Sequence, residues 1–130
     1  MDFLERLIDY MEGLSFMPSD IKIGLFDENG NSVAIRPMPS AINERYVEQS
    51  KIYPYSFQVL VHNKSNFMAY EVSQKLMSVL DMIDEGLIQS SNNSFKLVSI
   101  RCTTTPNFVQ KTGYGYLWTM MFEAELFVKG

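Results

Sequence analysis

The side chains that could do chemistry are few and scattered in this sequence. It holds one histidine, His62, and one cysteine, Cys102. Nucleophilic catalysis needs a base beside the nucleophile and a third group that orients the base. No Gly-x-Ser-x-Gly elbow or cysteine-rich context accompanies His62. We therefore interpret His62 as a structural or surface histidine and Cys102 as a small buried hydrophobic residue.

Acidic side chains gather at two places. Asp81, Asp84 and Glu85 cluster near the end of a predicted helix, and Glu123 and Glu125 share one face of a predicted strand. Either group could in principle bind a divalent cation or transfer protons. No Asp-x-Asp-x-Asp-Gly loop supplies further ligands, so a solvated acidic surface is the favoured interpretation. We predict no catalytic residue, no metal site and no cofactor.

Phosphate and nucleic-acid binding have equally little support. The stretch Gly113–Gly115 lacks the third glycine of a dinucleotide motif, and no helix is predicted after it. An aromatic sheet can bind RNA by stacking, but Lys and Arg are scattered here, and the net charge of −4 disfavours nucleic acid. A monomeric ligand- or RNA-binding α+β module stays open as an alternative.

Composition indicates one small globular domain. The chain has 130 residues, 46% hydrophobic and 20% charged, so we expect a single domain over residues 1–130. One cysteine allows no internal disulfide, which is typical of a protein folded in a reducing cytoplasm. No apolar run approaches the roughly 18 residues that a membrane span needs, and the acidic N-terminus is unlike a signal peptide. We therefore expect neither secretion nor a membrane partner.

Two helices are predicted from the spacing of apolar residues. The first runs from Phe3 to Gly13, with Asp2 and Glu5 as its capping box. The second begins at Asn66 as its N-cap and ends near Gly86. It carries an i,i+4 ion pair between Glu71 and Lys75.

Alternating patterns predict the strands. Residues 21–25 and 32–36 are expected to form a hairpin across the turn Asp27–Asn31, because Asn-Gly favours such turns. Further strands are expected at 55–62, 95–105 and 116–129, with a connector at 38–52 and a loop at 106–115 that begins with Pro106. The predicted class is α+β: a mostly antiparallel sheet of about four to five strands with two helices packed on one face.

Aromatic residues are more numerous than a small core needs. The chain has nine Phe, seven Tyr, one Trp and nine Met. Tyr46, Phe108 and Tyr114 stand in polar connecting segments, so we interpret them as anchors of a subunit interface. The alternative, that they fold back onto their own core, stays open.

Three stretches carry a resemblance to a known family. They are Ala34–Ser40 with its Arg-Pro-x-Pro turn, Tyr53–Val61 with Pro-Tyr-x-Phe-Gln, and Met68–Val72 at the start of a helix. Together they resemble the tail terminator, or minor capsid (tail completion), proteins of siphophages that infect Gram-positive bacteria. The resemblance covers residues 20–88 by motif. Head-completion or connector proteins of the same neck region are the alternative within phages.

The resemblance implies a structural protein and not an enzyme. It implies a homo-hexameric ring on the last ring of the tail tube, which stops tail elongation and joins the tail to the head connector. The expected partners are copies of this chain, the major tail tube protein and a head-completion or connector protein, while DNA passes through the ring without specific binding. The expected location is the virion neck, after assembly in the host cytoplasm. An infectious phage, a prophage remnant and a tailocin remain equally open sources.

A ring needs projecting segments and a lumen. Residues 27–31, 37–50 and 105–116 are the segments able to reach a neighbour. The predicted interface residues are Asp27, Glu28, Asn29, Gly30, Asn31, Arg36, Tyr46, Phe108, Tyr114 and Tyr116. Asp81, Asp84 and Glu85 are predicted to face the lumen, where negative charge would repel passing DNA.

Overall fold

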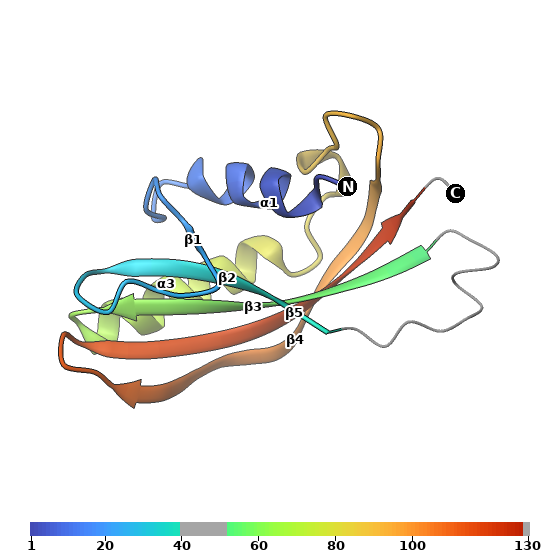
Figure 1. Ribbon diagram of the computed structural model, residues 1–130. Coiled ribbons are helices and arrows are strands. Elements are labelled where there is room, and N and C mark those ends of the chain that lie inside the picture. The colour runs from blue at the N-terminus through green and yellow to red at the C-terminus, as the bar shows by residue number, and fades with distance from the viewer. Residues whose placement is uncertain (40–51, 129–130) are drawn as a thin grey trace.

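A computed structural model describes residues 1–39 and 52–128. They form an α+β fold with a five-stranded mixed sheet of order β1-β2-β3-β5-β4 (Figure 1). The elements are α1 (Phe3–Glu12), β1 (Lys22–Ile23), β2 (Ser32–Met38), β3 (Ile52–Asn63), α3 (Asn66–Leu80), the 3₁₀ helix η1 (Glu85–Leu87), β4 (Lys96–Lys111) and β5 (Tyr116–Phe127). The predicted fold class is confirmed, with antiparallel pairing everywhere except between β1 and β2.

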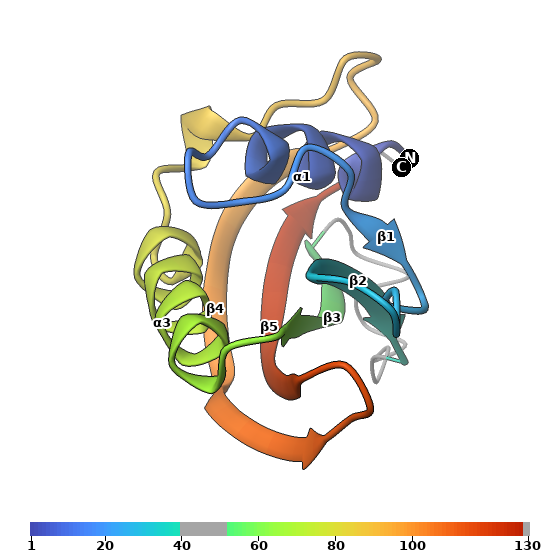
Figure 2. The same cartoon turned by 90° about the vertical axis from the view of Figure 1, so that its left-hand side faces the viewer.

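One main core lies between the two helices and one face of the sheet (Figure 2). Phe57 of β3 and Phe122 of β5 stack with ring centroids 5.3 Å apart. Phe3 of α1 meets Phe95 edge-on at 5.4 Å. The alternation predicted for β5 is confirmed, since four of its inward side chains are buried: Met120, Phe122, Ala124 and Leu126.

Helix α3 is shorter than predicted. Its N-cap is Ser65 and not Asn66, because the Ser65 hydroxyl accepts the Met68 N–H at 3.2 Å. The helix ends at Leu80 and not near Gly86. Met82 takes a positive φ of 61°, and its N–H donates to the Ile100 carbonyl of β4 at 2.9 Å, so the sheet edge draws the chain out of the helix. The predicted Glu71–Lys75 ion pair forms, at 3.2 Å.

The predicted capping box of α1 is wrong. Asp2 makes no side-chain cap hydrogen bond. Its carboxylate instead accepts the hydroxyls of Ser90, Ser91 and Ser94 at 2.7–2.9 Å and the Ser91 N–H at 2.9 Å. Desolvation alone would raise the pKa of Asp2, but these hydrogen bonds together outweigh it and hold the pKa well below its usual range. Asp2 thus links the start of α1 to the turn before β4.

The predicted hairpin between residues 21–25 and 32–36 is also wrong. Strand β1 pairs with β2 in parallel, with Lys22 opposite Ala34. Gly24, at φ +87°, turns the chain away after β1. The Asn29 N–H donates to the Asp27 carboxylate at 2.9 Å, so the Asn-Gly turn closes locally and does not join two antiparallel strands.

The loop predicted at 106–115 is mostly strand. Strand β4 passes through Pro106 and continues to Lys111. A proline is tolerated because β4 lies at the edge of the sheet, where an outward N–H has no partner to lose. The pairing shifts register between Thr104 and Asn107, which accommodates the ring.

Candidate assembly surface

Three turns meet at one end of the molecule: residues 27–31, 63–65 and 112–115, here called the turn end (left in Figure 1). His62, which is 1% exposed, connects two of them. Its Nδ1 lies 3.0 Å from the Asp27 carbonyl and 2.9 Å from that of Gly30, and its Nε2 lies 2.6 Å from the Thr112 hydroxyl. Carbonyls only accept, so Nδ1 carries the proton and Nε2 accepts from Thr112. The interpretation of His62 as a structural histidine is confirmed.

Further contacts hold the third turn in place. The Lys64 N–H donates to the Asn31 side-chain oxygen at 2.9 Å. The backbone of Gly115 lies so close to Asn63 and Lys64 that a Cβ on Gly115 would overlap their main-chain atoms. The turn end is therefore a preorganised surface, with backbone from three distant parts of the sequence locked together.

Phe26 and Tyr114 pack on the His62 ring. Their ring centroids lie 4.8 and 5.5 Å from that of His62. Tyr114 is half-buried against its own chain, whereas Glu28 and Asn29 are exposed at the tip of their turn. The structure thus brings the predicted residues 27–31 and Tyr114 to one place, although they are more than 80 residues apart in sequence.

Beside the turn end, five aromatic side chains form a continuous strip on the helix-covered side of the sheet. We call Phe67, Tyr70, Trp118, Phe108 and Tyr116 the aromatic strip. Successive ring centroids lie 6.4, 5.4, 6.1 and 6.5 Å apart. The Trp118 indole N–H donates to the Asn66 side-chain oxygen at 2.9 Å and so fixes the middle of the strip. Phe67 is 67% exposed and Phe108 49%.

The aromatic strip is suited to binding protein and not to chemistry. Exposed aromatic side chains with a rigid backbone are typical of the centres of protein interfaces. Phe108 and Tyr116 were predicted from the sequence, and Phe67, Tyr70 and Trp118 were not. The signal for Phe67 and Tyr70 was available: they stand three residues apart on the first turns of a helix, outside its buried stripe.

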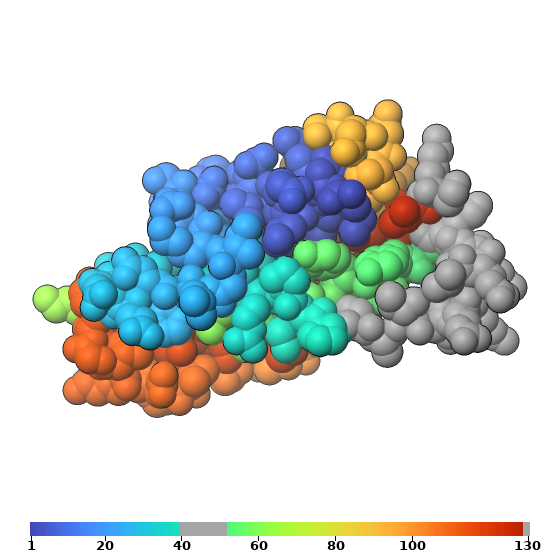
Figure 3. Space-filling view, viewed as in Figure 1, coloured from blue at the N-terminus to red at the C-terminus, as the bar shows by residue number. Residues whose placement is uncertain are grey.

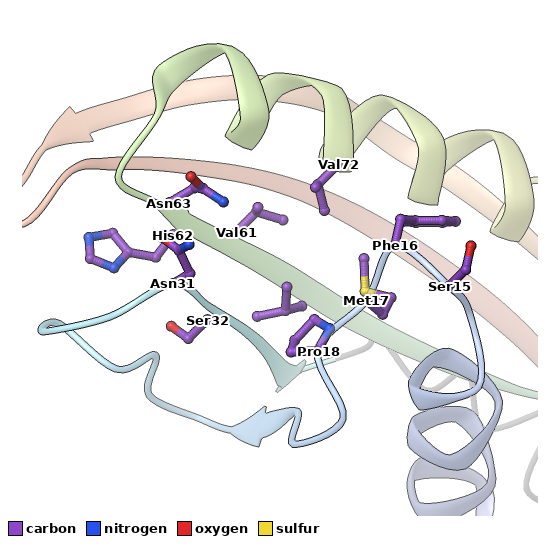
Figure 4. A pocket seen from close by; sticks show the side chains of 11 residues that line it. Ser15, Phe16, Met17, Pro18, Asn31, Ser32, Val61, His62, Asn63 and Val72 are labelled. Atoms are coloured by element: carbon purple, nitrogen blue, oxygen red, sulfur yellow. The ribbon is translucent and has the colours of Figure 1, made fainter.

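A cavity of about 230 Å³ opens between α3, β3 and residues 15–18 (Figure 4). Its walls include Phe16, Met17 and Val72, and the His62 ring is directed away from its centre toward the turn end. Among the described residues lining the cavity there is no carboxylate, amine or thiol. Its polar lining comes from Ser15, Ser32 and two asparagines, together with His62, whose ring nitrogens are already hydrogen-bonded at the turn end.

The predicted acidic cluster does not converge on a site. The Asp81 carboxylate accepts the Cys102 N–H of β4 at 2.8 Å, and the Asp84 carboxylate accepts the Gly86 N–H at 2.9 Å. Two of these acids thus have local structural partners, while Glu85 is exposed. Within residues 1–39 and 52–128, no three His, Cys, Asp or Glu side chains are placed to hold a metal ion.

Cys102 packs against the core but is half-buried, and so is less buried than the sequence analysis predicted. Burial raises the pKa of its thiol, and the neighbouring Asp81 charge adds to the rise.

Arg36 is exposed on β2, separated by β3 and β5 from β4 of the aromatic strip. Tyr46 and residues 40–51 of the predicted connector lie outside the described part of the chain. None of the described helices is both long and apolar enough to cross a membrane.

Comparison with known proteins gives one family. A family model described as bacteriophage tail terminator protein matches residues 10–127. A search of curated proteins finds no match. Seven chains of solved structures match, and one of them is similar in fold with 20% sequence identity and a TM-score of 0.52, covering 98% of this chain and 91% of the other. At this identity the likeness extends to the fold alone.

Proposed function

Because the chain belongs to the bacteriophage tail terminator family, we propose that it forms a hexameric ring on the last ring of the tail tube and ends tail growth there. Membership makes it a virion-associated structural protein of a phage tail. The proposal rests on the family match over residues 10–127, which includes every strand of the sheet. In this proposal the opposite side of the ring binds the head connector, at the neck, after assembly in the host cytoplasm.

The surface described above supports a role in assembly. A ring is built from heterologous contacts, in which two different surfaces of one subunit meet. The aromatic strip and the turn end supply a rigid, exposed surface of the composition such contacts use. The family match also favours a terminator over a head-completion protein of the same neck region. The Gram-positive host rests on the sequence resemblance alone.

The lumen proposal concerns Asp81, Asp84 and Glu85. The net charge of −4 fits a ring through which DNA passes without being held. Replacing Asp84 and Glu85 by lysine tests it, because lysines in the lumen would retain DNA and slow its ejection. Unchanged ejection kinetics from such particles would contradict a lumen position for these two acids.

Deletion of the gene tests the main proposal. Without the protein, electron microscopy of lysates should show tail tubes of uncontrolled length that carry no heads. Wild-type protein supplied in trans should restore uniform, joined tails. Phe67→Asp should fail to restore them, while Leu87→Asp, a matched change at an exposed apolar residue away from the aromatic strip, should succeed. Normal-length, fully joined particles without the protein would overturn the proposal.

A further inference from the structure

The two edges of the sheet carry exposed apolar side chains. At the β1 edge, Ile23 is 60% exposed and Leu25, just beyond the strand, is 81% exposed. At the β4 edge, Phe108 is 49% and Val109 47% exposed. Natural sheets protect their edges with charged residues, proline or bulges. Strand β4 has Pro106 and register shifts at this edge, yet apolar side chains remain exposed at both edges of the sheet, which favours their being covered by protein.

Strand β4 is protected along its first half only. The Met82 N–H donates to the Ile100 carbonyl, and the Asp81 carboxylate accepts the Cys102 N–H, so the segment after α3 covers the outer edge there. No described strand pairs with the outer edge of residues 103–111. In the space-filling view this part of β4, in orange, forms the lower border of the molecule (Figure 3).

The two edges stand at the same height along the sheet. The pairing register places Lys22 opposite Ala34, Ala34 opposite Leu60, Leu60 opposite Thr119, and Thr119 opposite Asn107. One row therefore runs from β1 to the unprotected half of β4. Contacts between subunits that sit at equal height close into a ring, whereas an offset would produce a helical filament.

The directions of the two edge strands, β1 and β4, are also compatible with pairing between neighbouring subunits. Strands β1 and β2 are parallel, and the three following pairs are antiparallel. Strand β1 therefore runs opposite to β4. Rotation about an axis roughly along the strands preserves these directions, so β4 of one copy would meet β1 of the next in antiparallel orientation, the stronger of the two ladder types.

From these observations we infer that the outer edge of β4, at residues 103–109, docks on the β1 edge of a second copy of this chain. The sheet then continues from subunit to subunit on either side of Pro106, which has no N–H to donate, with Phe108 and Val109 of one copy covered together with Ile23 and Leu25 of the next. This inference rests on the proposed ring and deepens it by assigning the two halves of its interface. A two-fold contact between two β4 edges is the rival arrangement, but it leaves Ile23 and Leu25 exposed.

Cysteine cross-linking tests the pairing. In a Cys102→Ser background, Ile23→Cys and Thr105→Cys are made singly and together, and each protein is treated with a short bis-maleimide, alone and bound to tail tubes. The double variant should give a ladder of covalent oligomers up to the hexamer, and the single variants should remain monomers on denaturing gels. A covalent dimer from Thr105→Cys alone would overturn the inference in favour of the two-fold contact.

Native mass spectrometry of the same samples separates this inference from the proposed function. A hexamer whose double variant does not cross-link would overturn the edge pairing and leave the ring intact. A protein that stays monomeric both alone and on tail tubes, yet still restores uniform tails, would overturn the pairing and also the ring. Tails that reach normal length without the protein would overturn the proposed function itself.

The equilibrium constant for assembly gives a second test of the edge pairing. Leu25→Glu should weaken assembly by at least about tenfold, because burying one leucine is worth more than one tenfold step in an equilibrium constant. Leu87→Glu is the matched control, since Leu87 is an exposed leucine of η1, which lies near the start of β4, where Gln89 bridges to Lys96, and not at residues 103–109. Both side chains are exposed, so both variants should fold, as circular dichroism would verify. Equal assembly of the two variants would contradict the inference.

Discussion

The two halves of β4 pair with the same neighbour, β5, yet their surroundings differ. Residues 96–102 place Leu97 and Ile100 in the core, where they are 1% and 0% exposed, and the segment after α3 covers their outer edge. Residues 103–111 are almost entirely exposed, include two register shifts, and contribute Phe108 to the aromatic strip. The first half thus stabilises the monomer, and the second presents a rigid surface that the monomer does not use.

This difference shows where a small sheet protein can place an assembly surface. Apolar side chains in the first half contribute to folding at about 25 cal/mol per Å² of surface removed from water. The same residue types in the second half contribute little until a partner covers them. The structure of the second half is maintained by β5 and by the turn end, so that it is in position before any partner arrives.

Substitutions in the two halves of β4, made one at a time, should give the largest contrast in the free energy of unfolding. Ile100→Ala should lower the free energy of unfolding by about 2–4 kcal/mol, because it removes buried methyl groups and leaves a cavity. Val109→Ala, in the exposed half, should change it by no more than about 0.5 kcal/mol. Urea unfolding followed by Trp118 fluorescence measures both. Similar losses for the two variants would contradict the distinction between the halves.

The turn that ends the exposed half offers the next largest effect. Gly115→Ala should destabilise the protein by about 1–3 kcal/mol, because its Cβ would overlap the backbone of Asn63. Gly113→Ala is the matched control, two residues away in the same turn, with nothing within 4 Å of its added Cβ and no positive φ. It should be neutral or slightly stabilising. Thermal unfolding of both variants provides the measurement, and equal melting temperatures would show that the turn end is not tightly packed.

A smaller effect on stability is expected where the segment after α3 covers the outer edge of the first half of β4. Asp81→Ala should cost about 1 kcal/mol, because the Cys102 N–H loses its side-chain acceptor. Glu85→Ala, at a neighbouring exposed acid, should change stability by only a few tenths. Hydrogen exchange at the Cys102 amide is the direct measurement. Unchanged protection in Asp81→Ala would mean that this carboxylate does not cover the strand edge.

Elements with local signals could be predicted from the sequence. The inward face of β5 and the Glu71–Lys75 pair depend only on the periods of a strand and a helix, and both were correct. The course of β1 depends on the positive φ of Gly24 and on the Asp27 side chain closing its own turn. Pro106 signals a strand end unless the strand is known to be an edge, and edge position follows from the whole sheet order.

The candidate site was predicted only in part, because some of its residues have local sequence signals and others come together only through tertiary contacts. Phe108 and Tyr116 stand out because they are aromatic residues in a segment rich in polar side chains. Phe67 and Tyr70 look like ordinary helical residues, and their contact with Trp118 arises only when α3 packs across β5. The link that His62 makes between two turns is likewise tertiary, since its partners lie 32 to 50 residues away.

The smallest expected effect concerns Asp2, at the turn that leads into the protected half of β4. Its folded-state pKa is lowered, so the stability it contributes is present above the unfolded pKa of about 3.9 and is lost as the pH falls below that value. Asp2→Asn should therefore be less stable than wild type at neutral pH, and the difference should shrink as the pH falls from about 4 toward 2. Melting temperatures across this range measure it. A constant difference for Asp2→Asn would mean that the serine hydroxyls stabilise the carboxylate no more than water does.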